Sequence, residues 1–142
     1  MPPTLILDTN VLVAALRSSL GASHELLHRV GTGQFDIGVT TPLVLEYEAA
    51  CTRPELVPGR TPEEIGDVVD YLCHVGRRAA VHFRVRPATA DPGDDLVLEA
   101  AVASGSRWIV THNVKDMEAG AARYGIEVIT PGEALRRLEG DQ

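Results

Sequence analysis

The sequence predicts a single α/β domain over residues 1–142, a three-layer sandwich around a central, mainly parallel sheet. Short apolar runs with the length of strands alternate along the chain with longer amphipathic segments that have the spacing of helices. Such alternation is typical of parallel sheets whose strands are joined by right-handed helical crossovers. A length of 142 residues fits one domain, and no linker or internal repeat divides the chain.

The expected strands are apolar or alternate between apolar and polar residues. They cover residues 5–7, 35–39, 80–85, 108–110 and 126–129. Helices are expected at 11–17, 23–30, 94–104 and 115–124, with three more that begin at the capping signals described next. Leu5-Ile6-Leu7 has the character of a buried parallel strand that stops at Asp8.

Three threonine-proline pairs mark helix starts, because a threonine oxygen accepts from free amides and proline suits the first helical turn. They are Thr41-Pro42, Thr61-Pro62 and Thr130-Pro131. The last two are followed by Glu64 and Glu133, three residues after the threonines, which predicts two full capping boxes.

Composition excludes several classes of protein. The chain is 44% hydrophobic without any apolar run near the ~20 residues that a membrane helix needs. The N-terminus has no signal-peptide pattern, so the cytoplasm is the expected location. Cys51 and Cys73 lack metal-ligand spacing and are expected to be buried free thiols. A net charge of −7 argues against a general nucleic-acid coat protein, yet carboxylates that hold cations would still suit a nuclease.

Polar residues gather where the predicted strands end, which is where parallel α/β sheets bind ligands. The first strand ends in Asp8-Thr9-Asn10, and the strand at 108–110 ends in Thr111-His112-Asn113 with Asp116 close behind. Further acids lie on two helices that follow strands: Glu46 lies early on the helix that starts at Pro42, and Asp94 and Asp95 open the helix before the strand at 108–110. Convergent carboxylates suit Mg²⁺, which can activate a water molecule and polarise a phosphodiester.

Each of these residues also has a structural interpretation. Asp8 is equally well placed to cap the helix after it, and Asp91-Pro92-Gly93-Asp94 has the form of an N-cap. Asp95 and Glu99 can share a solvated face, and Glu46 and Glu48 cannot both face one site.

The polar residues beside the acids carry the same two interpretations. Asn10 and Asn113 can cap helices and Thr111 can be a strand residue, or with Thr9 they can orient carboxylates and metal-bound waters. Orientation is favoured, because all four residues stand at strand ends. His112 is a candidate phosphate contact that we leave outside the catalytic set.

Positive charge is concentrated at residues 77–86. His82, Arg84 and Arg86 alternate with apolar residues and would share one face of a strand. Arg84 and Arg86 are therefore candidate contacts for RNA or an acidic partner, although a charged edge strand protected against aggregation explains them slightly better.

Four segments together resemble the PIN-domain toxins of the VapC type. They are Leu7-Asp8-Thr9-Asn10-Val11-Leu12, Leu45-Glu46-Tyr47-Glu48, Asp94 leading into Ala100-Ala101 and Gly105, and Ile109 to Met117. Any one segment is a weak signal, whereas the order and spacing of all four, over nearly the whole chain, are fairly specific.

The resemblance implies a PIN-like fold with five parallel strands and an acidic quartet that binds Mg²⁺ or Mn²⁺ to cleave single-stranded RNA, leaving 5′-phosphate and 3′-hydroxyl ends. The quartet would be Asp8, Glu46, Asp94 and Asp116. Asp95 is the alternative to Asp94, whose spacing to residues 101–105 matches better, and Asn113 stands where many relatives carry Asp. The resemblance also implies a small cognate antitoxin and a homodimer.

Two other functions remain open at the level of sequence. A HAD-type phosphatase also has an aspartate after its first strand, but it needs a second acid where this chain has Asn10. A PIN-like module that binds RNA or a partner without cleavage is the other alternative, and the presence of all four acids argues against it.

Overall fold

The computed structural model describes residues 2–81 and 92–140. The strands are β1 (Thr4–Leu7), β2 (Asp36–Val39), β3 (Arg77–Arg78), β4 (Trp108–Val110) and β5 (Glu127–Ile129). The helices in this part of the chain are α1 (Thr9–Arg17), α2 (Ala22–His28), α3 (Thr41–Cys51), α4 (Pro62–Val75), α5 (Pro92–Ser104), α6 (Val114–Ala122) and α7 (Pro131–Gly140).

The five strands form one parallel sheet in the order β3-β2-β1-β4-β5. The chain moves from β1 toward one edge through β2 and β3, and then returns to the other side of β1 to form β4 and β5. The strand order therefore reverses between β1 and β4, and such a reversal opens a crevice at the carboxyl ends of the strands. The predicted five-stranded, mainly parallel sheet is confirmed, and every pairing is parallel.

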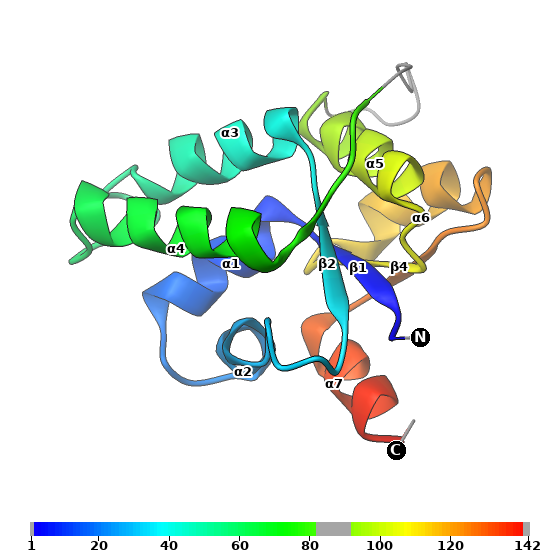
Figure 1. Cartoon of the computed structure of the whole chain (residues 1–142), viewed down its shortest axis with the longest axis horizontal. Helices are drawn as coiled ribbons and strands as arrows, with labels where there is room; N and C mark the ends of the chain where they lie inside the picture. The colour runs from blue at the N-terminus through cyan, green and yellow to red at the C-terminus, as the bar shows by residue number, and fades with distance from the viewer. Residues whose placement is uncertain (1, 82–91, 141–142) are drawn as a thin grey trace.

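Helices cover both faces of the sheet, with α5 and α6 on one side and α1, α2 and α4 on the other (Figure 1). β1 is the central strand, and Leu5, Ile6 and Leu7 are almost fully buried within it. The close packing of α5 requires Gly38 in β2, because a Cβ there would lie 2.6 Å from Ser104 Oγ and 2.9 Å from Ile6 Cδ1. The three-layer architecture is thus confirmed.

The structure confirms the predicted capping box of α4, moves the cap of α3 by one residue, and shows only one of the two capping bonds predicted for α7. Thr61 and Glu64 form the predicted capping box at α4. At α3 the cap is Thr40 rather than Thr41, because Thr40 has the extended backbone of a cap and its hydroxyl accepts from Leu43 N. At α7 Thr130 accepts from Glu133 N, while the Glu133 carboxylate pairs with Arg136 and Arg137.

The third strand lies earlier in the chain than predicted. β3 is a two-residue strand at Arg77–Arg78, and residues 79–81 are irregular. The prediction placed it at 80–85, of which 82–85 fall outside the described residues. Apolar alternation does not mark β3, because β3 pairs with β2 directly after α4 and consists of two exposed arginines.

Within the described ranges no helix is both long and apolar enough to cross a membrane.

Candidate functional site

The ends of β1 and β4 place Asp8 beside Thr111. Leu7 pairs with Val110 in the sheet, and Asp8 N donates to the Val110 carbonyl at 2.9 Å. Asp8 is 7% exposed and Thr111 is fully buried. Although Asp8 occupies the N-cap position of α1, its side chain makes no capping bond; Oδ2 accepts from Thr111 Oγ1 at 2.7 Å. The capping interpretation of Asp8 is therefore wrong.

The Thr111 hydroxyl uses its full hydrogen-bonding capacity. It accepts from Asn10 Nδ2 at 3.2 Å and from Asn113 N at 3.0 Å. A hydroxyl has one donor and two acceptor sites, so the single proton of Thr111 is directed at Asp8. Asn10 also accepts from His112 N through Oδ1, which ties the start of α1 to the loop after β4. Asn113 is the N-cap residue of α6, but its side chain makes no capping bond.

Helix α3 brings Glu46 to the same edge of the sheet. Its neighbour Tyr47 is 2% exposed and donates a 2.5 Å hydrogen bond to the carbonyl of Leu7, the residue before Asp8. Burial and the nearby negative charge of Asp8 both raise the pKa of the Tyr47 hydroxyl, which therefore stays protonated and able to donate. Glu46 is half-buried and Glu48 is exposed, as expected of two acids two residues apart.

The two acids at the start of α5 lie in different environments. Asp94 is half-buried and faces a pocket, whereas Asp95 is only 4% exposed and Glu99, one turn later, only 2%. The expectation that Asp95 and Glu99 share a solvated face is wrong, because this face of α5 packs into the protein.

One pocket of about 330 Å³ brings three predicted acids together. Its lining comes from the end of β1 with α1, from α3 and the turn after it, and from the starts of α5 and α6. The lining residues are Asp8, Thr9, Asn10, Val13, Glu46, Ala50, Arg53, Leu56, Gly93, Asp94 and Asn113.

Other predicted site residues lie elsewhere. Asp116 is exposed on the first turn of α6 and is not part of the pocket lining. His112 is exposed, and its Nε2 makes a 2.9 Å hydrogen bond with Ser23 Oγ of α2. Arg84 and Arg86 lie outside the described residues.

Sequence reasoning missed Arg53 and Tyr47. Arg53 is the single basic side chain among the described residues that line the pocket. Glu46, Ala50 and Arg53 are spaced i, i+4 and i+7, so one helical face continues beyond the end of α3 to Arg53. This periodicity was the available signal. Tyr47 gave none, because a buried tyrosine next to an acid is ordinary in a helix core.

The chemistry of the donors fits a hard divalent cation. The pocket offers three carboxylates, and the buried Thr9 hydroxyl has no hydrogen-bond partner in the described structure. Across residues 2–81 and 92–140, no three His, Cys, Asp or Glu side chains are grouped closely enough to ligate one ion together. Mg²⁺ is commonly held by one or two carboxylates and keeps several waters, so the donors fit this mode of binding.

The fold and this pocket define a class: a parallel α/β sandwich with carboxylates at the reversal point of its sheet. A family model described as PIN domain matches residues 4–115, and the chain belongs to the PIN-domain family. No curated protein matches the sequence. Among solved structures, the chain is similar to one in the crystal structure of VapBC2 from Rickettsia felis bound to a DNA fragment from their promoter. The identity is 13% and the TM-score 0.60, over 89% of this chain and 98% of that chain. At this identity the likeness establishes a common fold.

Proposed function

We propose that this protein is a Mg²⁺- or Mn²⁺-dependent endoribonuclease that cleaves single-stranded RNA and acts as the VapC-type toxin of a toxin–antitoxin pair. The observation that carries the proposal is the pocket in which Asp8, Glu46 and Asp94 meet at the reversal point of a PIN fold. The resemblance of four segments to VapC-type toxins, and the fold shared with a chain of a VapBC2 structure, support the toxin role.

Within the proposal, one or two of Asp8, Glu46 and Asp94 would bind the cation directly and the remaining acids would hold its waters, with Asp116, outside the pocket lining, as a fourth acid. When bound, the ion lowers the pKa of a water molecule and polarises the scissile phosphate. Thr111 holds Asp8 in one orientation, because its only hydroxyl proton is committed to Oδ2. Asn10 and Asn113 in turn hold Thr111. Asp95 is buried and is not among the lining residues, so the proposal gives it no role in binding the ion.

The proposal is tested on purified protein that carries no bound partner, with a labelled single-stranded oligoribonucleotide. Cleavage should require Mg²⁺ or Mn²⁺, stop in EDTA and leave 5′-phosphate and 3′-hydroxyl ends. Asp8→Asn should lower the rate by about 100-fold and weaken Mn²⁺ binding, since the loss of even an outer-shell partner of a metal ligand commonly costs about 10–100-fold.

The matched control is Asp70→Asn, which removes an exposed acid of α4 outside the pocket and should leave the rate unchanged. Thermal unfolding of both variants, followed by the fluorescence of the one tryptophan, Trp108, checks that they fold. Cleavage without metal, or full activity of Asp8→Asn, contradicts the mechanism. RNA binding without cleavage would instead favour the non-catalytic module.

The partner is tested separately. A small protein encoded beside this reading frame should co-purify with the chain and suppress cleavage, and expression of the chain alone should arrest growth unless Asp8 is mutated. The mass of the purified chain in solution tests the homodimer that the resemblance implies. A monomeric chain with no inhibitory neighbour would remove the toxin assignment and leave the nuclease proposal standing.

A further inference from the structure

Arg53 carries a charge that the metal site does not explain. The described pocket lining includes three carboxylates, so the pocket repels an approaching phosphodiester unless positive charge is supplied. A bound cation offsets part of this repulsion at the scissile phosphate. Arg53 is the single basic group among the described lining residues and stands in the same wall as Glu46.

The backbone of Arg53 is held firmly although its side chain is exposed. Its amide donates to the Ala50 carbonyl at 3.2 Å, and its own carbonyl accepts from Leu56 N and Val57 N, each at 3.0 Å. Val57 is 2% exposed and anchors this turn in the core. The backbone of Arg53 is therefore fixed in the wall of the pocket, while its exposed side chain has only Glu55 as an ion-pair partner among the described residues.

The partner of the guanidinium holds it only weakly. Arg53 Nε lies 3.3 Å from Glu55 Oε1, and the two side chains are 63% and 65% exposed. Ion pairs at this exposure contribute little to stability, because water and salt screen them. A phosphate can offer two acceptor oxygens to the planar guanidinium, which one surface carboxylate at this distance does not match.

We propose that Arg53 is a substrate-binding residue that contacts a backbone phosphate of single-stranded RNA next to the scissile bond, with Glu55 holding its guanidinium until RNA enters. This inference rests on the proposed nuclease function. It assigns to Arg53 part of the preference of that nuclease for an RNA strand over a mononucleotide. Because a phosphate contact reads no base, the contribution of Arg53 is independent of sequence.

The test compares steady-state cleavage and binding in matched variants. Arg53→Ala should raise KM for an oligoribonucleotide about tenfold with little change in kcat, as expected for a charged hydrogen bond lost in both ground and transition states. Arg53→Lys should recover part of this loss, because an ammonium keeps the charge without the two-pronged geometry. Arg123→Ala, at an exposed arginine of the α6 terminus, should match the unmodified chain.

Two further readouts separate RNA contact from a structural or metal effect. In the Asp8→Asn background, fluorescence anisotropy of a labelled oligoribonucleotide should show the slope of log affinity against log salt reduced by about 0.7 by Arg53→Ala, the value for one phosphate contact. In the otherwise unmodified chain, Arg53→Ala should leave Mn²⁺ affinity and the melting temperature unchanged. Glu55→Gln should tighten oligonucleotide binding about twofold, because it removes the negative charge that competes with the phosphate for Arg53.

The possible failures are distinguishable. If the unmodified chain neither binds nor cleaves RNA, the proposed function falls and this inference with it. If it cleaves RNA but Arg53→Ala behaves like Arg123→Ala, only the role of Arg53 is overturned. An altered Mn²⁺ affinity with an unchanged salt slope also overturns it, because Arg53 would then act on the carboxylates rather than on RNA.

Discussion

The hydroxyl of Thr111 donates its only proton to Oδ2 of Asp8, across the gap between the two central strands where the order of the sheet reverses. Thr111 receives hydrogen bonds from Asn10 and Asn113 in return. One buried hydroxyl therefore joins the end of β1, the start of α1 and the loop before α6, and it sets the direction of Asp8, the pocket acid that follows the central strand.

Replacing Thr111 by Val should destabilise the fold by about 1–3 kcal/mol, because the shape is kept while buried polar partners are left unsatisfied. Mn²⁺ affinity should fall as Asp8 loses its fixed orientation. Urea unfolding and Mn²⁺ titration measure the two effects. Thr111→Ser retains the hydroxyl and should restore most of the metal affinity; if Ser and Val weaken it equally, the hydroxyl does not orient Asp8.

Tyr47→Phe removes the hydrogen bond to the Leu7 carbonyl and should cost about 1–2 kcal/mol of unfolding free energy. This bond joins the helix that carries Glu46 to the strand that ends at Asp8, so Mn²⁺ affinity should also decline. Phe keeps the aromatic ring of Tyr, so the packing of the ring is retained and only the hydroxyl is lost. If Tyr47→Phe loses stability but binds Mn²⁺ normally, Tyr47 does not set the spacing between Glu46 and Asp8.

Two buried groups predict a loss of stability at alkaline pH. Burial raises the pKa of the Cys51 thiol to about 11 and also raises the pKa of Tyr47. Below the ordinary thiol pKa of 9.0 the folded and unfolded chains are both protonated, so stability is unaffected there. As the pH rises through 9 to 11, only the unfolded chain ionises freely, and the free energy of unfolding falls.

Urea titrations between pH 7 and 11 measure this decline, which Cys51→Ala should make shallower although that variant starts from a lower stability. In the native protein at pH 8, an alkylating reagent should label the half-buried Cys73 well before the buried Cys51. Equal labelling of both thiols would contradict the burial of Cys51.

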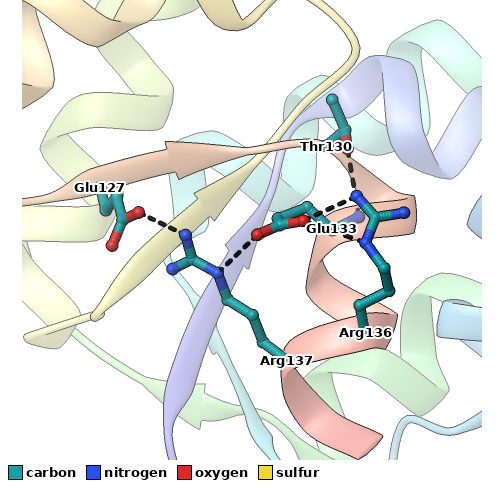
Figure 2. Close-up of polar contacts among 5 residues, drawn as sticks. All are labelled: Glu127, Thr130, Glu133, Arg136 and Arg137. Carbon is teal, nitrogen blue, oxygen red and sulfur yellow. Dashed lines mark hydrogen bonds and ion pairs between the residues drawn. The ribbon is translucent and has the colours of Figure 1, made fainter. Parts of the chain in front are cut away.

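The arginines of α7 provide a matched pair for surface electrostatics. Arg137 bonds both Glu127 and Glu133, as Figure 2 shows, and its guanidinium lies 5.3 Å from the centre of the Trp108 ring. Among the residues that the structure describes, the Arg136 side chain bonds Glu133 alone; it is 70% exposed, against 29% for Arg137. Arg137→Ala should cost roughly 1 kcal/mol and alter Trp108 fluorescence.

Arg136→Ala should have a smaller effect on both measurements. These ion pairs lower the pKa of Glu127 and Glu133, so their stabilisation is present above the ordinary carboxyl pKa and is lost as the pH falls through the lowered values. The difference between the two variants should therefore shrink in acid. If the two variants have equal effects at neutral pH, the additional contacts of Arg137 with Glu127 and Trp108 do not contribute to stability.

Local patterns were sufficient for most of the elements. The capping chemistry of Thr61 and Glu64 acts within one helical turn, and the apolar run Leu5-Ile6-Leu7 reports its own burial, so both were correctly predicted. β3 was misplaced because its two arginines are a strand only through pairing with β2. No pattern within the segment itself carries that information.

In the candidate site, too, some features follow from local sequence and others from packing between distant elements. Sequence by itself determined the candidate acids, because a residue type and its place after a strand or within a helix are local properties. These candidates are Asp8 at the end of β1, Glu46 within α3, and Asp94 with Asp95 at the start of α5. Only the tertiary structure decided that Asp94 rather than Asp95 faces the pocket, that Asp116 lies outside its lining, and that Arg53 joins it. The direction of a side chain depends on how its helix is rotated against the sheet, and packing between elements far apart in the chain sets that rotation.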